Sequence, residues 1–428
     1  MTVRTRFAPS PTGQVHIGNM RAAIYNWLFA RHEGGKFLLR IEDTDRERST
    51  PEAVKTVLDA MDWLGLSVDE EPLYQSTQSK AHLEAAEKLL AAGRAYKLDK
   101  GGLGKGEATL FRMPGTDMQF HDEIKGDMKK EAKDLPDFVI VRSDGNPVFH
   151  LANVVDDIAM NITHVIRGDD HVENTFRHVA LFQALGAPVP KYAHLPMIVN
   201  AQGKPYSKRD GAAFVGDFQQ QGYLAGALFN YLALIGWSPG GDREVMTRDE
   251  MVQLFTLDRV QSKAGQFDLK KFQWMNSEHL QRSPQDEWRR RFRDAFPAAS
   301  DASYLDKVIE LMKPRVKGWK EIPSAIYFFS DDFPMDPEAV QKRLKAPGVA
   351  DLLRDLRSAV DALTSFDSVS LEAKLRELAE SKGIKPADLI HPVRVAVSGV
   401  QGGPSLFHML EVLGKERVLL RLDRMHLS

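Results

Sequence analysis

The chain has 428 residues, of which 43% are hydrophobic and 27% charged, with a formal net charge of −2 and no cysteine. This balance is typical of a globular protein with two or three domains, and it excludes disulfides, thiolate metal sites and, since no long apolar run is present, a membrane span. The near-neutral charge leaves a nucleic-acid partner open, because basic groups contact phosphates locally. Met1 to Phe7 contain two arginines and no apolar signal core, so we expect a folded strand there and a cytoplasmic protein.

Residues 1–240 mix strand-like and helical patterns. Short buried strands are predicted at 3–8, 36–41, 138–142, 164–167 and 194–199. Between the first two strands, Met20, Ile24, Trp27 and Leu28 share one helical face, and Gly34-Gly35 supplies the stop. A strand, a helix and a strand within about 40 residues form a βαβ unit, so we expect a parallel sheet with a right-handed crossover.

An insertion is predicted at about residues 80–140, with short strands within 107–120 and an exposed, glycine- and lysine-rich loop at 100–106. Ser143-Asp144-Gly145-Asn146 is a hairpin turn signal between two strands. After residue 240 the strand signal fades, and helices are predicted at 249–256, 284–296, 303–313, 337–345, 349–363, 370–381 and 405–422. The C-terminal third is therefore predicted to be all-α.

The first candidate site lies in the turn after the first strand. The run Arg6 to Gly13 contains two prolines and is followed by His16-Ile17-Gly18-Asn19, with a helix predicted to begin near Asn19. The carboxyl edge of a parallel sheet binds ligands, and a helix N-terminus attracts anions through its free N–H groups. His16 could therefore bind a phosphate, and Gly18 would let a purine approach the backbone. The alternative is an ordinary turn with a surface histidine.

The second candidate site is a polar loop from Gln202 to Gly211. It contains Ser207-Lys208-Arg209 and follows a predicted strand. Lys208 could stabilise negative charge that develops on a triphosphate. A solvated basic loop is the alternative interpretation.

The two sites together resemble the H-I-G-H and K-M-S-K-S signatures of class I aminoacyl-tRNA synthetases. Further runs resemble the glutamyl branch of that class, and they cover nearly the whole chain: Arg6–Arg48, Phe149–Asp157, Val165–His171, Asn230–Trp237, His391–Gly399 and Leu413–Leu419. The resemblance implies an α/β fold with a Rossmann-like parallel-sheet catalytic domain at 1–240, which contains an inserted acceptor-binding subdomain. All-α C-terminal domains would follow, with a helical stem-contact domain at 241–310 and an anticodon-binding domain at 311–428.

Three positions depart from the pattern of the family. Asn19 replaces the last histidine of the first signature, as is common in the glutamyl branch. Pro205 stands where many relatives have the first lysine of the second signature, with Lys204 one place earlier. Phe149 replaces a tyrosine that reaches the substrate side chain in many relatives, so the stacking surface is kept and one hydroxyl contact is lost.

The charges of glutamate indicate which side chains its pocket needs. Arg6 and Arg167, at the ends of predicted strands, offer bidentate forks to two carboxylates, and Glu42 can pair with the ammonium group. The resemblance implies the same roles, with Ser10, Asn153 and Phe149 completing the substrate site. It implies catalytic roles for His16 and Lys208, and ATP contacts from His16, Gly18, Asn19, Ser207, Lys208 and Arg209.

The activity implied is ATP-dependent ligation of L-glutamate to the 3′ end of tRNA(Glu), with Mg²⁺, by a monomer. No zinc is expected, because Tyr96-Lys97-Leu98-Asp99 lacks the cysteines that bind zinc in some relatives. A two-metal site built from Asp156-Asp157 and Asp169-Asp170-His171 is a minor alternative.

Four other functions remain open at this point. They are a glutamine–tRNA ligase, a shorter enzyme that glutamylates a tRNA base, a small-molecule nucleotidyltransferase and a non-catalytic RNA-binding regulator. The helical C-terminal third argues against the first three, and retention of Arg6, His16, Glu42 and Lys208 argues against the last. The sequence does not decide whether glutamine tRNA is also charged.

Overall fold

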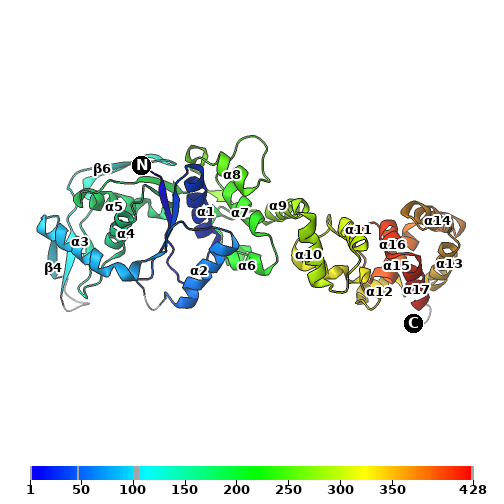
Figure 1. Cartoon of the computed structure of the whole chain (residues 1–428). Coiled ribbons are helices and arrows are strands. Elements are labelled where there is room, and N and C mark those ends of the chain that lie inside the picture. Colours follow the sequence, from blue (N-terminus) through cyan, green and yellow to red (C-terminus); the bar gives the residue numbers. More distant parts are fainter. Residues whose placement is uncertain (1, 46–47, 100–105, 426–428) are drawn as a thin grey trace. The chain divides into compact units, whose positions relative to one another are not determined.

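A computed structural model describes residues 2–45, 48–99 and 106–425. The chain forms two compact units, Met1–Met275 and Asn276–Ser428, the first of mixed strands and helices and the second helical (Figure 1). No helix in the described ranges is both long and apolar enough to cross a membrane.

The first unit contains the predicted βαβ start. Strand β1 (Arg4–Phe7) pairs in parallel with β2 (Lys36–Ile41), and β2 pairs in parallel with β3 (Leu73–Tyr74). Helix α1 (Ile17–His32) connects β1 to β2 and packs against both strands (Figure 1). The parallel-sheet fold class is therefore confirmed.

A glycine permits the close approach between the turn after α1 and the chain just before β1. A Cβ atom added at Gly35 would lie 2.3 Å from the Val3 carbonyl oxygen, so only glycine fits the turn into β2. The apolar face predicted for the helix is buried, since Met20, Ile24 and Leu28 are fully inaccessible in the core of this unit.

The other half of the sheet comes from β9 (His164–Gly168) and β10 (Lys191–Leu195), which pair in parallel. The Thr163 N–H donates to the Arg4 carbonyl, which places β1 beside β9. Helix α5 (Val172–Ala184) connects β9 to β10. The carboxyl ends of β1, β2, β9 and β10 therefore lie at one edge of the sheet.

The prediction of one strand at 194–199 was wrong. Strand β10 ends at Leu195, and a separate strand β11 (Ile198–Val199) pairs with β12 (Gly265–Gln266). Pro196 lies between β10 and β11 and has no N–H to donate to a sheet, which explains the interruption.

The segment between β3 and β9 contains the predicted insertion. Helix α3 (Ser79–Ala91) precedes an antiparallel sheet of β4 (Ala95–Asp99), β5 (Glu107–Phe111) and β8 (Phe138–Val141). Strands β6 (Met118–Asp122) and β7 (Gly126–Lys130) form a hairpin that joins β10. The predicted loop at 100–106 lies almost wholly outside the described residues.

The turn predicted at Ser143–Asn146 forms, but it does not join two strands. The Gly145 N–H donates to the Arg142 carbonyl, and the returning chain makes one β-bridge at Pro147. Helix α4 (Phe149–Ala159) then begins.

Helix α2 (Pro51–Trp63) lies between β2 and β3 in the chain. Helices α6 (Val215–Gln220), α7 (Ala225–Leu234) and α8 (Arg248–Leu254) follow β11. Helix α9 (Leu269–Arg282) was not predicted and begins in the first unit, where Phe272 and Met275 are buried in the core.

The second unit has no strand among its described residues, as predicted. Its helices are α10 (Gln285–Ala295), α11 (Ala302–Met312), a 3₁₀ segment η6 (Trp319–Phe328), α12 (Pro337–Arg343), α13 (Val349–Asp361), α14 (Ser368–Ser381), α15 (Ala387–Ser398), α16 (Leu406–Leu413) and α17 (Lys415–Arg424). The single helix predicted at 405–422 is two helices, because Gly414 has a positive φ of 83°. The helix at α15 and the η6 segment were not predicted.

Candidate active site

A cavity of about 570 Å³ lies at the carboxyl edge of the sheet. It is lined by residues from the ends of β1, β2, β9 and β10 and from the starts of α1 and α4. Those that the sequence predicted for the site are Arg6, Ser10, His16, Gly18, Asn19, Glu42, Phe149, Asn153 and Arg167. Residues separated by more than 150 positions in the chain thus meet at one place.

His16 caps α1 and contacts the second signature. The helix begins at Ile17, two residues earlier than predicted, and the Gly18 N–H donates to His16 Nδ1 at 3.0 Å. Since Nδ1 accepts, the neutral ring carries its proton on Nε2, which lies 3.1 Å from the Tyr206 carbonyl oxygen. Burial lowers the pKa of His16 more than the Tyr206 carbonyl raises it, so the ring is neutral at pH 7.

The second signature borders the cavity only in part. Pro205 and Tyr206 line it, whereas Ser207, Lys208 and Arg209 do not. Ser207 caps a short 3₁₀ turn, η4 (Lys208–Asp210), and both its N–H and its hydroxyl donate to Asp210. Lys208 Nζ lies 4.5 Å from the centre of the Phe214 ring. The cap holds the loop in this position, so ATP contacts from these three residues stay a prediction and require the loop to move.

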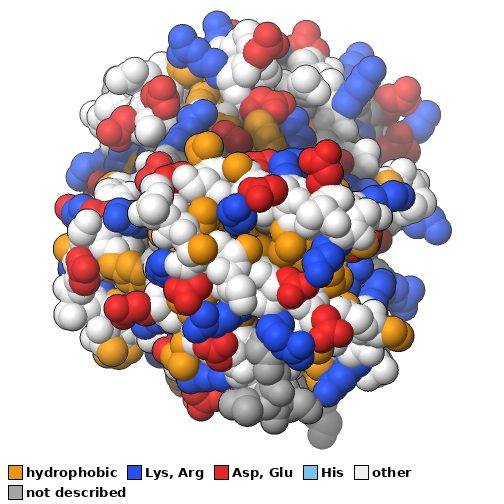
Figure 2. Space-filling view, turned by 90° about the vertical axis from the view of Figure 1, so that its right-hand side faces the viewer, with side chains coloured by type: hydrophobic (Ala, Val, Ile, Leu, Met, Phe, Trp, Pro, Cys, Tyr) orange, Lys and Arg blue, Asp and Glu red, His pale blue; other side chains and the backbone are white. Residues whose placement is uncertain are grey.

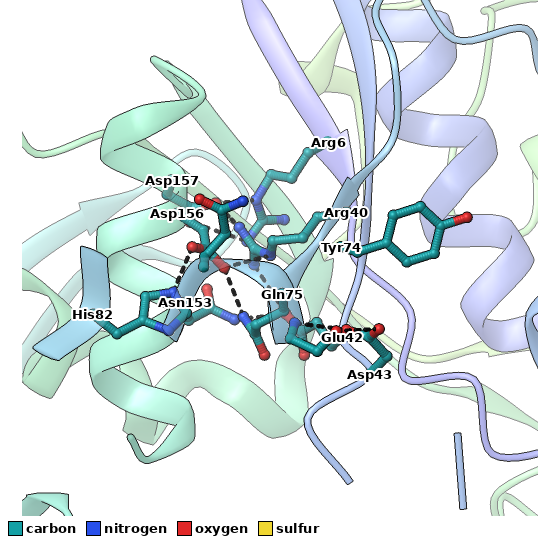
Figure 3. A network of polar contacts seen from close by, with 12 residues as sticks. Arg6, Arg40, Glu42, Asp43, Tyr74, Gln75, His82, Asn153, Asp156 and Asp157 are labelled. Carbon is teal, nitrogen blue, oxygen red and sulfur yellow. Dashed lines mark hydrogen bonds and ion pairs between the residues drawn. The ribbon is translucent and has the colours of Figure 1, made fainter. Parts of the chain in front are cut away.

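A chain of buried charges supports the substrate side of the cavity (Figure 3). Arg40 in β2 is fully buried, and it donates from Nη2 to Glu42 Oε1 at 2.9 Å and from Nη1 to Asp157. Asp157 in turn accepts from Arg6 Nε at 3.1 Å. The charges alternate in sign along the series Arg6, Asp157, Arg40 and Glu42. Its two ends, the cation Arg6 and the anion Glu42, line the cavity.

Neighbouring opposite charges outweigh burial in setting the pKa values of Arg40 and Asp157. Burial alone would lower the pKa of Arg40, but Asp157, Glu42 and Asp156 together raise it above its ordinary value. Burial would likewise raise the pKa of Asp157, but Arg6 and Arg40 hold it below its usual range. Both groups are therefore charged at neutral pH.

The partners of Asp156 and Asp157 give these carboxylates a role other than binding metal. Asp156 accepts from Gln75 Nε2 at 2.9 Å and lies 2.6 Å from His82 Nε2, while Asp157 is engaged by two arginines (Figure 3). Among the described residues, no group of three or more His, Cys, Asp or Glu side chains could hold a metal ion.

Glu42 and Arg167 are two further charged groups of the wall, which also includes Arg21 and Asp170. Glu42 Oε1 accepts from Asn153 Nδ2 at 2.8 Å as well as from Arg40. Arg167 is 8% exposed and forms no ion pair with any described carboxylate. Burial lowers its pKa to about 10, so it stays cationic at neutral pH. Arg40 and the side chains that hold Arg167 were not predicted as part of the site, and Asp157 was considered only for the alternative two-metal site.

Comparison with known proteins places this architecture in one family. Residues 2–102 and 105–274 match the family described as tRNA synthetases class I (E and Q), catalytic domain, and residues 279–426 match an anticodon binding domain. The chain therefore belongs to the class I tRNA synthetases of the E and Q type, and it is an aminoacyl-tRNA synthetase.

Similar full-length proteins place it within that class. It is 42% identical to a glutamate–tRNA ligase of Xanthomonas euvesicatoria pv. vesicatoria, over 99% of this chain and 98% of the relative, and 40% identical to one of Akkermansia muciniphila, over 98% of each. A crystal structure of a glutamate tRNA ligase from Elizabethkingia meningosepticum, in complex with its amino acid, matches with a TM-score of 0.87 at 29% identity and covers all of both chains. The chain belongs to the glutamate–tRNA ligase family.

Proposed function

We propose that this chain ligates L-glutamate to the 3′ end of tRNA(Glu) through a glutamyl-adenylate, with release of pyrophosphate and AMP, as a cytoplasmic monomer. The observation that carries the proposal is the charge of the cavity wall. Arg6 and Arg167 are cations for two carboxylates, and Glu42 is an anion for one ammonium group. Glutamate carries this set of charges, and the uncharged amide of glutamine would leave one of the two buried arginines without a substrate carboxylate.

The reaction is in-line attack of a substrate carboxylate on the α-phosphate of ATP. Arg6, Glu42, Asn153 and Arg167 bind and orient the amino acid, and positioning of this kind supplies much of the rate. Mg²⁺, when bound with ATP, neutralises charge on the phosphates.

The ATP side of the cavity lies at the start of α1. Gly18 lines the cavity without a side chain, which leaves its backbone open to a nucleotide. Neutral His16 can turn its Nε2–H from the Tyr206 carbonyl to a phosphate oxygen. The adenosine hydroxyl at the tRNA end then attacks the mixed anhydride.

One assay separates the candidate functions. Radiolabelled glutamate and glutamine are offered separately with ATP and total tRNA, and acid-precipitable product is counted. The proposal is supported if glutamate becomes attached to tRNA and mild alkali releases it again, because such release is typical of an ester to the terminal ribose. Charging with glutamine only, or no charging of either amino acid, overturns it.

The second unit is the proposed reader of the anticodon. Among its cations, Arg394, Lys415 and Arg417 donate to backbone carbonyls of Pro404, Asp361 and Phe328. Lys313, Arg315 and Lys317 follow α11, and the last two are exposed. On the face drawn in Figure 2, lysine and arginine side chains are interspersed with acidic ones. We therefore expect base stacking and edge contacts to contribute more than net charge.

The proposed division of the helical part is a stem-contact domain at 241–310 and an anticodon domain at 311–428. Residue 310 lies inside α11, so a truncation is better placed after Ser283, between the end of α9 at Arg282 and the start of α10 at Gln285. A chain ending there should keep its cavity and show a much higher KM for tRNA. Two transcripts that differ only in the anticodon are charged by both chains. Undiminished discrimination by the truncated chain would exclude the second unit as the reader.

Phe149 offers a test of the substrate side. Its ring lines the cavity and stacks on the His171 ring, with ring centres 5.9 Å apart. Because the ring is only half-buried, Phe149→Tyr should be tolerated, and its hydroxyl could tighten glutamate binding by about 1 kcal/mol, the value of one hydrogen bond. The measurement is the KM for glutamate. A large loss of activity would mean that the ring packs where no hydroxyl fits.

A further inference from the structure

Arg167 differs from Arg6 and Arg40, which are paired with carboxylates, in the partners that it has. Its Nε donates to His194 Nε2 at 3.3 Å, and its Nη2 donates to Thr175 Oγ1 at 2.8 Å and to the His171 carbonyl at 3.3 Å. Its Nη1 lies 3.5 Å from His178 Nδ1. All of these acceptors can be neutral, whereas Arg6 shares its charge with Asp157. A buried cation without a counter-ion is costly, and it favours an anionic ligand strongly.

The position of one proton follows from the partner of His194. Its Nδ1 lies 2.5 Å from Asp122 Oδ2, and both side chains are inaccessible to solvent. A carboxylate can only accept, so His194 Nδ1 carries the hydrogen and Nε2 presents its lone pair. That lone pair faces the Arg167 Nε–H and the Thr175 hydroxyl, which lies 3.0 Å away.

Asp122 is itself held rigidly. Its Oδ1 accepts from the N–H groups of Ile124, Lys125 and His194 at 3.0, 2.9 and 3.2 Å. The residue ends β6, in the inserted segment, and pairs with Tyr192 of β10. The insertion therefore supplies a fixed carboxylate that reaches the cavity only through the imidazole of His194.

We propose that Asp122 and His194 are positioning residues, which aim Arg167 at a substrate carboxylate while leaving its positive charge uncompensated. A carboxylate in direct contact would fix the guanidinium equally well, but it would neutralise the charge that the substrate needs. The neutral imidazole of His194 fixes the guanidinium and leaves its positive charge for the substrate. This inference rests on glutamate being the substrate, since it concerns how one of its two carboxylates is bound.

The surroundings of His194 favour the neutral ring. The Tyr192 ring stacks on it with ring centres 6.0 Å apart, and the Phe120 ring lies 6.2 Å away. Burial lowers the pKa of His194 more than Asp122 raises it, and the nearby charges of Arg167 and Lys125 also lower it. An imidazolium would in addition place a donor against the Arg167 Nε–H.

The decisive variant is Asp122→Asn. The asparagine amide can donate to His194 Nδ1, which moves the ring proton to Nε2 and sets two donors against each other at Arg167. We expect the KM for glutamate to rise at least about 10-fold, the effect of one hydrogen bond to a charged group. The KM for ATP should stay unchanged, and kcat should fall less than the KM rises.

A conservative series at His194 separates positioning from packing. In His194→Gln the side-chain carbonyl can still accept from Arg167, so glutamate KM should stay closer to that of the wild type than in His194→Leu. A role in packing alone predicts the reverse order, because leucine is the better apolar filler. This series keeps the test valid even if Asp122→Asn folds poorly.

The same hairpin supplies a matched control. His121 Nδ1 lies 2.6 Å from Asp127 Oδ1, in an exposed pair that does not line the cavity. Asp127→Asn should leave the KM for glutamate unchanged. If wild-type protein fails to charge tRNA with glutamate, the proposed function falls. If it charges normally and Asp122→Asn matches Asp127→Asn in glutamate KM, only the inference about Asp122 and His194 is overturned.

Discussion

Replacing His16 by alanine should lower the rate of amino-acid activation by about 10²–10³, the usual loss for one donor that acts in the transition state. Binding of tRNA should stay nearly intact. Lys208→Ala should have an effect of the same size if its loop closes over ATP. The measurement is pyrophosphate exchange with tRNA present.

The structure shows why His16 needs a second variant. Its Nδ1 caps α1, so alanine also removes a helix cap, which costs about 1 kcal/mol of stability. Asparagine at this position keeps the cap and lacks the Nε2–H, so His16→Asn should be as slow as His16→Ala. Thr50 caps α2 in the same way, by accepting from the Ala53 N–H at 3.2 Å, and Thr50→Ala should lose stability without losing rate. Activation at the wild-type rate in His16→Asn would exclude a phosphate contact from this ring.

Local patterns in the sequence predicted the elements that depend on local chemistry. The short apolar run at 36–41 predicted β2 as observed, and the helical periodicity predicted α1 and most helices of the second unit. The failures occurred at single residues whose effect depends on their partners. Pro196 divides a strand because β11 pairs with β12 instead of continuing beside β9, and Gly414 divides a helix through its positive φ.

The site was predicted where a motif marks it and missed where distant residues support it. His16, Glu42 and Arg167 belong to recognisable runs. Arg40 was missed, although an arginine inside a buried strand was a signal that a carboxylate must face it. Its partner Asp157 is 117 residues away, and no local pattern could pair the two. The same is true of Asp122 and His194, which are 72 residues apart.

The support beneath the substrate site is also the most sensitive point for stability. Asp157 is 3% exposed and is the common partner of Arg6 and Arg40. Asp157→Asn would leave both arginines buried with less compensation, and removing one partner of a buried pair costs about 3–5 kcal/mol. Because the pKa of Asp157 is depressed in the folded state, its contribution is fully present at neutral pH and is lost only as the pH falls through that lowered value.

The expected loss can be measured against an exposed pair on α2. Lys55 Nζ lies 2.6 Å from Asp59, with both side chains more than half exposed, so Asp59→Asn should change the free energy of unfolding by about 0.5 kcal/mol or less. Urea denaturation is followed by hydrogen exchange in β1 and β2, which isolates the first unit from the second. If Asp157→Asn is no more destabilising than Asp59→Asn, then Arg6 and Arg40 do not depend on this carboxylate. Other residues of the wall would then hold Arg6. The charges of Arg6, Asp157 and Arg40 would lie close together without stabilising one another.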